Sequence, residues 1–230
     1  MASPKRYYSR DTPLPMTNAR DPVIVSFART PQGKFGGALA EVSAPDLGGT
    51  VIRAAVARAG IAPEAVGEVV MGIVLPAGLG QHPARQAAVA GGIPNAVPAY
   101  NINKMCGSGM KALMNAANAI RAGEHDVVVA GGMESMSRTP FLIGRQKWKP
   151  DPDSEPIDHL FHDGLCDPYH DIAMGCTGDH VAATRGVSRA ESDGFALESH
   201  RRAAHATDTG WYDNEITPVT TPHGDVTRDE

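Results

Sequence analysis

The sequence is poor in cysteine, in aromatic residues and in positive charge. It has three cysteines in 230 residues, and an odd number cannot all pair within one chain. We see no secretory signal pattern, so we expect a reducing compartment, the cytoplasm. A net charge of −5 gives no basic surface for nucleic acid. No apolar run approaches the roughly 20 residues that a bilayer requires, so we expect no membrane contact.

A metal site is also not favoured. Cys166 and Cys176 lie in a histidine-containing stretch, but they lack the paired C-x-x-C spacing of structural zinc sites. The histidines of that stretch are His159, His162, His170 and His180. We therefore interpret the stretch as polar loop with scattered histidines.

The composition is that of a globular protein, with 42% hydrophobic and 20% charged residues. The length allows one large domain or two small ones. Residues 1–20 differ because they combine basic residues with Pro4, Pro13 and Pro15, and carry no apolar periodicity. We predict a disordered extension at 1–20. An alternative is untranslated sequence before a start at Met16, and an organelle-targeting peptide is less favoured because Asp11 is acidic.

Strand-like and helix-like segments alternate through the first part of the chain. We predict strands at 23–27, 68–74, 100–103 and 126–130. A helix begins at Ser43, which precedes Pro45, and ends at Gly60. Further helices cover 83–90 and the segment after Cys106. This alternation predicts an α/β fold, a mostly parallel sheet with helices on both faces.

The character changes after residue 137. Prolines and acids cluster at 150–156, and no strand pattern is visible from 138 to about 171. Two helices then follow, at 174–185 and from Ser188 to about Ala206, where Glu191 completes a capping box. Residues 211–219 are a strand candidate.

Cys106 is the most informative residue, because it lies where a predicted strand meets a predicted helix. Unpaired N–H groups and the positive dipole end of a helix favour the thiolate, which is the nucleophilic form. Gly107 and Gly109 leave room for a substrate close to the backbone. The competing interpretation is a buried cysteine that acts as a small hydrophobe.

Several motifs in one order resemble the thiolases, the acetyl-CoA acyltransferases. These are VIVSFARTP at 23–31, GQHPARQA at 80–87, NKMCGSGMKAL at 103–113 and VVVAGGMESMSRTPF at 127–141. The related ketoacyl synthases are disfavoured by CGSG. The resemblance implies a thiolase-like N-terminal α/β domain at 21–137, whose last strand is missing, and a truncated inserted loop domain at 138–230.

The resemblance makes Cys106 the nucleophile, which carries the acyl group as a thioester. It implies acyl transfer between CoA thioesters, by thiolysis of a 3-ketoacyl-CoA or by the reverse condensation. Acyl-CoA and CoA are then substrates, and no cofactor or metal is implied. The family takes its activating histidine from a GHP motif and a second cysteine from a C-x-G motif in its C-terminal half. We expect neither here, so we expect a truncated, inactive chain.

The resemblance also bears on assembly and on the acyl pocket. It implies a homodimer or homotetramer of the complete protein, and the alternative function is a non-catalytic scaffold subunit that dimerises through the 100–103 strand. Met174 is expected in the acyl pocket. Ala173 replaces a histidine frequent in acetoacetyl-CoA-type thiolases, which favours a broader-chain enzyme. Met133 and Met136 fit either an acyl channel or a core, and for Glu134 we expect a structural role.

Overall fold

The computed structural model describes residues 20–230. The extension predicted at 1–20 therefore lies outside the described residues, except for its last residue. The Arg20 side chain donates to the carbonyl oxygen of Ile120 at 2.8 Å and to the carboxylate of Asp126 at 2.8 Å. Arg20 is thus attached to the body of the protein.

A parallel three-stranded sheet forms the centre of the molecule. Its strands are β1 (Glu68–Gly72), β2 (Ala99–Ile102) and β3 (Val128–Gly132), in the order β2-β1-β3. Val70 of β1 lies opposite Tyr100 on one side and opposite Ala130 on the other. The structure confirms the predicted parallel sheet.

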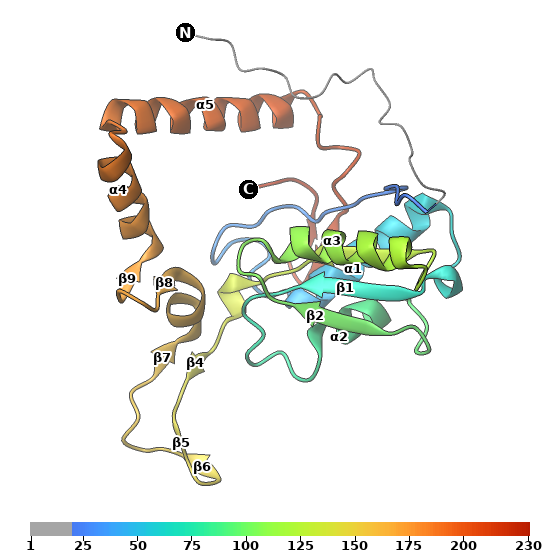
Figure 1. Ribbon diagram of the computed structural model, residues 1–230, viewed down its shortest axis with the longest axis horizontal. Helices are drawn as coiled ribbons and strands as arrows, with labels where there is room; N and C mark the ends of the chain where they lie inside the picture. The colour runs from blue at the N-terminus through green and yellow to red at the C-terminus, as the bar shows by residue number, and fades with distance from the viewer. Residues whose placement is uncertain (1–19) are drawn as a thin grey trace.

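Helices cover both faces of this sheet (Figure 1). Val69 and Met71 of β1 pack in one cluster with residues of α1 (Ala44–Ala59) and α2 (Pro83–Ala90). Side chains alternate along a strand, so Gly72 faces the other side. There a Cβ on Gly72 would touch Ser108, the first residue of α3 (Ser108–Ala122). The core therefore lies between the sheet and the α1–α2 pair.

Local sequence explains where α1 begins and ends. The Ser43 side chain accepts the N–H of Asp46 at 3.3 Å, and Pro45 occupies the first turn. Gly60 ends the helix with a φ of 66°, a conformation that glycine adopts without strain. The predicted helix boundaries are confirmed here.

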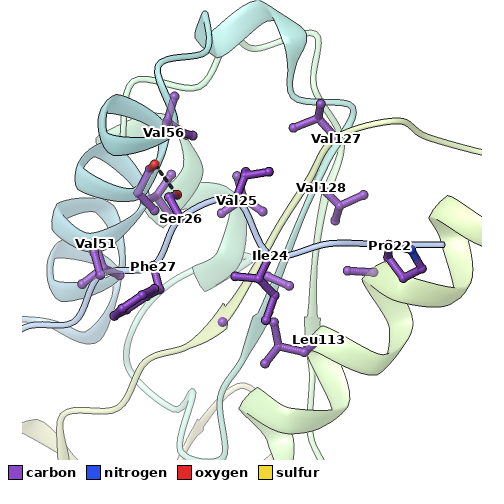
Figure 2. Close-up of a pocket in the computed structure, with 18 of the residues that line it drawn as sticks. Pro22, Ile24, Val25, Ser26, Phe27, Val51, Val56, Leu113, Val127 and Val128 are labelled. Carbon is purple, nitrogen blue, oxygen red and sulfur yellow. Dashed lines mark hydrogen bonds between the residues drawn. The ribbon is translucent and has the colours of Figure 1, made fainter. Parts of the chain in front are cut away.

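The predicted strand at 23–27 is wrong as a paired strand. The segment is extended but has no ladder with β3, and Ile24 is 78% exposed. Ser26 donates to the carbonyl oxygen of Ala55 in α1 at 2.6 Å, which holds the segment toward the helix. An apolar groove of about 520 Å³ therefore separates it from β3 (Figure 2).

Residues 138–173 contain short structure that the sequence did not predict. Two-residue strands form hairpins there: β4 (Phe141–Leu142) with β7 (Ile157–Asp158), β5 (Arg145–Gln146) with β6 (Lys149–Pro150), and β8 (Cys166–Asp167) with β9 (Ile172–Ala173). A six-residue π-helix, η3 (Leu160–Leu165), lies between β7 and β8. Strands of two residues are too short to give a period-2 pattern, which explains the wrong prediction.

Two helices stand away from the sheet, α4 (Met174–Arg185) and α5 (Arg189–Asp208) (Figure 1). The capping box of Ser188 and Glu191 is present, as predicted. The strand predicted at 211–219 is mostly wrong. Turns occupy 211–215, Ile216 forms only an isolated bridge with Arg29, and the hairpin begins at β10 (Val219–Thr221), paired with β11 (Gly224–Val226). Short 3₁₀ turns lie at Pro63–Ala65 and Met136–Arg138.

Among the described residues, no helix is long and apolar enough to cross a membrane.

The end of the chain packs against its first described segment. Arg29 forms a two-bond ion pair with Asp229, at 2.6 and 2.9 Å, and a second pair with Glu215 at 2.6 Å. The Arg29 guanidinium also lies 4.8 Å from the centre of the Tyr212 ring. Arg29 is therefore one of several residues that hold the end of the chain, together with Glu230, whose carboxylate accepts the N–H groups of Lys34 and Ala38.

Candidate active site

Cys106 lies in the turn between β2 and α3, and its side chain is exposed. It is two residues before the first helical residue, Ser108. The structure thus excludes the alternative of a cysteine buried as a small hydrophobe.

A small hydrogen-bonded network fixes the turn that carries this thiol. The Ser108 hydroxyl accepts the N–H of Lys104 at 2.8 Å and donates to the carbonyl oxygen of Met105 at 2.6 Å. The side-chain oxygen of Asn103 accepts the N–H of Met105 at 2.9 Å. Met105 itself has a φ of +49°, which is unfavourable for a residue with a side chain. The bonds on both sides of Met105 stabilise this conformation.

Ser108 is a residue that the sequence analysis did not single out. It is buried, with 5% of its surface exposed, and both hydrogen-bonding functions of its hydroxyl are used. Its position in the sequence could have identified it. Ser108 is a small polar residue two positions after the cysteine and at the start of a predicted helix, where serine frequently forms hydrogen bonds with backbone groups.

The start of α3 follows the thiol directly in the chain. Gly107 is the capping residue and supplies no side-chain hydrogen bond. The first N–H groups of a helix have no partner within the helix and carry partial positive charge. The N–H groups of Gly107 and Ser108 donate within the turn, to the carbonyl oxygens of Lys104 at 3.1 Å and of Met105 at 3.0 Å.

Three glycines bring the first turn of α3 close to the sheet. A Cβ on Gly72 would lie 2.6 Å from the main-chain carbon of Ser108. A Cβ on Gly132 would lie 3.3 Å from the Cα of Gly109. A side chain at Gly72 would force the turn away, so glycine at the end of β1 positions the cysteine.

Cys106 opens onto a pocket of about 390 Å³. The pocket is lined mainly by apolar residues from β1, β3, the turn before α3 and η3. They include Leu75, Met105, Met133, Met136, Leu160 and Leu165, with Glu134 as the single carboxylate. Met133 is also part of the core, with 7% of its surface exposed. Met133 therefore belongs to the core and also lines the pocket, and Met136 lines the pocket as well. A role of either residue in an acyl channel stays a prediction.

Glu134, in the loop after β3, lines this pocket and is hydrogen-bonded to the segment that follows β1. Its carboxylate accepts the N–H groups of Val74 at 2.8 Å and of Leu75 at 3.2 Å. Burial raises the pKa of Glu134, and this outweighs the two N–H groups and the charge of His159, which act in the opposite direction. The structural role expected for Glu134 is confirmed.

Two other residues named in the sequence analysis, Met174 and Cys166, are not among those that line this pocket. Met174 begins α4 with 43% of its surface exposed, and it is not among the residues that line the Cys106 pocket. Its place in an acyl pocket stays a prediction. Cys166 lies beside Asp171, with the sulfur 3.6 Å from a carboxylate oxygen. Partial burial and then Asp171 raise the pKa of the Cys166 thiol, so this thiol is a poor nucleophile.

Two motif expectations can be compared with the chain. No Gly-His-Pro occurs; the His82-Pro83 pair instead caps α2, where His82 accepts the N–H of Arg85 at 3.2 Å. A Cys-x-Gly string does occur, contrary to expectation, at residues 176–178. Cys176 lies within α4, is exposed, and is not among the residues lining the Cys106 pocket. Within residues 20–230, no group of three or more His, Cys, Asp or Glu side chains is arranged to hold a metal.

Comparison with known proteins decides the family. The family model described as "Thiolase, N-terminal domain" matches residues 22–230. The chain belongs to the thiolase family. The match covers the sheet, the Cys106 turn and η3, which confirms the resemblance drawn from the motifs.

Individual thiolases agree with this assignment. An acetyl-CoA acetyltransferase of Cupriavidus necator is 51% identical over 203 residues, which is 88% of this chain and 52% of the relative. A probable acetyl-CoA acetyltransferase of Escherichia coli K12 is 47% identical, with the same shares covered. A probable acetyl-CoA acyltransferase of Staphylococcus aureus is 42% identical over 214 residues, 90% of this chain and 54% of the relative. The chain spans about half the length of the curated relatives it matches.

Proposed function

We propose that this chain is the N-terminal part of a thiolase that transfers acyl groups between CoA thioesters, with Cys106 as the acyl carrier. The observation that supports this most is the exposed thiol of Cys106 at the uncapped start of α3, opening onto an apolar pocket. A reactive thiol beside an apolar pocket suits a thioester with a hydrocarbon acyl chain.

The proposed step is a transfer of the acyl group from sulfur to sulfur. The Cys106 thiolate attacks the thioester carbonyl carbon, a new carbon–sulfur bond forms, and the CoA thiolate leaves and takes up a proton. The N–H of Cys106 is our proposed donor to the oxyanion that develops on the carbonyl oxygen. CoA and acyl-CoA serve as substrates, and the step requires no metal or dissociable cofactor.

The second half of the reaction needs groups that we do not find near the thiol. Within residues 20–230, no histidine is among the residues that line the Cys106 pocket. The family's activating histidine comes from a motif that this sequence lacks. We therefore propose that these 230 residues alone are acylated slowly and do not complete a thiolase cycle.

Labelling by an acyl donor tests the function. The chain is incubated with acetyl-CoA and with a longer acyl-CoA, and intact mass is measured with time. We expect one acyl group per chain, absent from Cys106→Ser and retained in Cys176→Ser, the matched exposed-thiol control. Acylation that persists in Cys106→Ser contradicts the assignment. The longer donor also tests whether Ala173 accompanies a broader chain range.

One observation favours a second function, a non-catalytic scaffold that dimerises. β2 is an edge strand, hydrogen-bonded only to β1 within the described sheet, and an exposed edge can pair with a second copy. A homodimer or homotetramer of the complete protein is compatible with either function. Light scattering on the chain and on Asn101→Pro, which removes a β2 donor, tests it. A dimer without acylation favours the scaffold.

We propose that this protein is located in the cytoplasm.

A further inference from the structure

The pocket at Cys106 has room for more than an acetyl group. Its volume is about 390 Å³. An apolar cavity of about 150 Å³ is enough to hold benzene, a six-carbon molecule. An acetyl group on the Cys106 sulfur would therefore leave most of the pocket unfilled, and its apolar lining would stay in contact with water. The size of the pocket favours longer acyl groups.

The residues that line the pocket differ in their burial. Ile73, Leu75 and Met133 are buried hydrophobic residues, whereas Met105 and Met136 are largely exposed. The buried residues therefore form the inner part of the pocket, and the two methionines lie at its opening. Methionine side chains adapt to chains of different shape. A hydrocarbon chain that passes the methionines reaches an apolar interior, where its burial is favourable.

The pocket has no group that would bind a charged acyl chain. Among the described residues that line it, there is no lysine, arginine or histidine. Glu134 is the single carboxylate, and its two oxygens accept the N–H groups of Val74 and Leu75. A carboxylate at the far end of an acyl chain would lose its water here without gaining a cation, which is costly.

Gly164 is the η3 residue closest to the buried part of the pocket. A Cβ added at Gly164 would lie 3.3 Å from Cδ2 of Leu75, and both residues line the pocket. The φ of Gly164 is not positive, so a residue with a side chain can adopt the same backbone conformation. A larger side chain at this position would occupy the space beside Leu75. Glycine keeps that space open.

We propose that the Cys106 pocket selects hydrocarbon acyl groups of about six carbons or more over acetyl and over acyl groups that end in a carboxylate, and that Gly164 determines how deep the chain can enter. The inference rests on the proposed function in that Cys106 is the acyl carrier. Ala173, from which a broader chain range is expected, is not among the residues that line this pocket. The selectivity proposed here therefore comes from other residues.

Alkyl methanethiosulfonates test the pocket without CoA or any acyl donor. The thiolate attacks the sulfenyl sulfur of the reagent, a disulfide forms, and methanesulfinate leaves. Methyl, hexyl and 5-carboxypentyl methanethiosulfonate are compared on the whole chain; the last two differ in the carboxylate at the chain end. Peptide mass spectrometry gives the rates at Cys106 and at Cys176, an exposed thiol outside the pocket. The ratio of these rates removes the intrinsic reactivity of each reagent.

The Cys106-to-Cys176 ratio should be about five-fold higher for the hexyl than for the methyl reagent, because the longer chain is buried. For the 5-carboxypentyl reagent it should return to within about two-fold of methyl. Met136→Lys places a cation at the opening of the pocket. In this variant the 5-carboxypentyl ratio should rise above the hexyl ratio.

Gly164→Val should lower the hexyl ratio about three-fold and leave the methyl ratio unchanged. The matched control is Gly194→Val in α5, where an added Cβ would meet no atom within 4 Å; it should leave all three ratios unchanged. If urea denaturation shows that Gly164→Val does not fold, Gly164→Ala replaces it, with a smaller expected loss. An unchanged hexyl ratio in the folded variant would overturn the role of Gly164.

Two further results would overturn the proposal. A hexyl ratio no higher than the methyl ratio contradicts the size selectivity. A 5-carboxypentyl ratio equal to the hexyl ratio, or no gain for this reagent in Met136→Lys, contradicts the selection against a terminal carboxylate. Because the reagents contain neither CoA nor an acyl group, failure of Cys106 acylation contradicts the proposed function and leaves these measurements independent.

Discussion

The side-chain oxygen of Asn103 accepts the main-chain N–H of Met105 at 2.9 Å, and so holds the residue before the candidate nucleophile in a left-handed conformation. Met105 has a φ of +49°, which costs on the order of 1–3 kcal/mol for a residue with a side chain. The direction of the Cys106 thiol therefore depends on this one side chain and on Ser108.

We predict that Asn103→Ala loosens this turn. The loss of a hydrogen bond should lower the free energy of unfolding by about 1 kcal/mol, measured by urea denaturation. The rate of Cys106 acylation should fall more than stability does, because the thiol loses its fixed direction. The control is Asn115→Ala, which removes a bond to Tyr100 within α3 and β2. An unchanged acylation rate in Asn103→Ala contradicts the role of the turn.

A methyl group at Gly72 should displace the start of α3. The Cβ would lie 2.6 Å from the Ser108 main chain, which cannot yield without moving the turn. Gly72→Ala should cost about 1–3 kcal/mol of stability and suppress Cys106 labelling. Gly194→Ala is the control, because a methyl group added at this position in α5 would meet no atom within 4 Å; it should stabilise the chain by about 0.5–1 kcal/mol. The stability of both variants is measured by urea denaturation. Equal changes in stability for Gly72→Ala and Gly194→Ala would contradict the close approach of α3 to the end of β1.

The Arg29–Asp229 pair should make stability fall in acid. Arg29 holds the pKa of Asp229 below its ordinary value, near 3.9. The folded state then binds fewer protons than the unfolded chain, so the contribution is complete above pH about 4 and is lost as pH falls through the lowered pKa.

Asp229→Asn should therefore destabilise the chain by about 1–3 kcal/mol at pH 7, and the difference from the native chain should shrink below pH about 4. Urea midpoints at pH 7, 5, 4 and 3 measure this. Asp208→Asn removes an exposed pair with Arg228 and should change little. A difference that stays constant down to pH 3 contradicts the assignment of the shift to Arg29.

Local signals in the sequence predicted most of the α/β part. Ser43 and Gly60 mark the ends of α1, and the capping box at Ser188 marks the start of α5. These features act between residues that are close in sequence, so they can be recognised without the fold. The turn at Cys106 was recognised for the same reason, since a strand and a helix meet there.

Features that depend on distant contacts were missed. The segment at 23–27 has the composition of a strand, but Ser26 bonds to α1 and the segment does not reach the β3 edge. The residues of η3 show no sequence periodicity that would predict a helix. η3 lines the pocket because the chain folds back toward the ends of β1 and β3. The hydrogen bonds that Glu134 accepts from Val74 and Leu75 join residues 60 and 59 positions apart, and no spacing rule predicts them.

The most direct test of the central claim compares the three thiols of one molecule. The chain is treated with limiting iodoacetamide at pH 7.5, and alkylation of each cysteine is followed by peptide mass spectrometry. We predict that Cys106 reacts first, the exposed Cys176 more slowly, and Cys166 last, because partial burial and then Asp171 raise the pKa of its thiol. If Cys106 reacts no faster than Cys176, its position at the start of α3 does not activate it and the account is wrong.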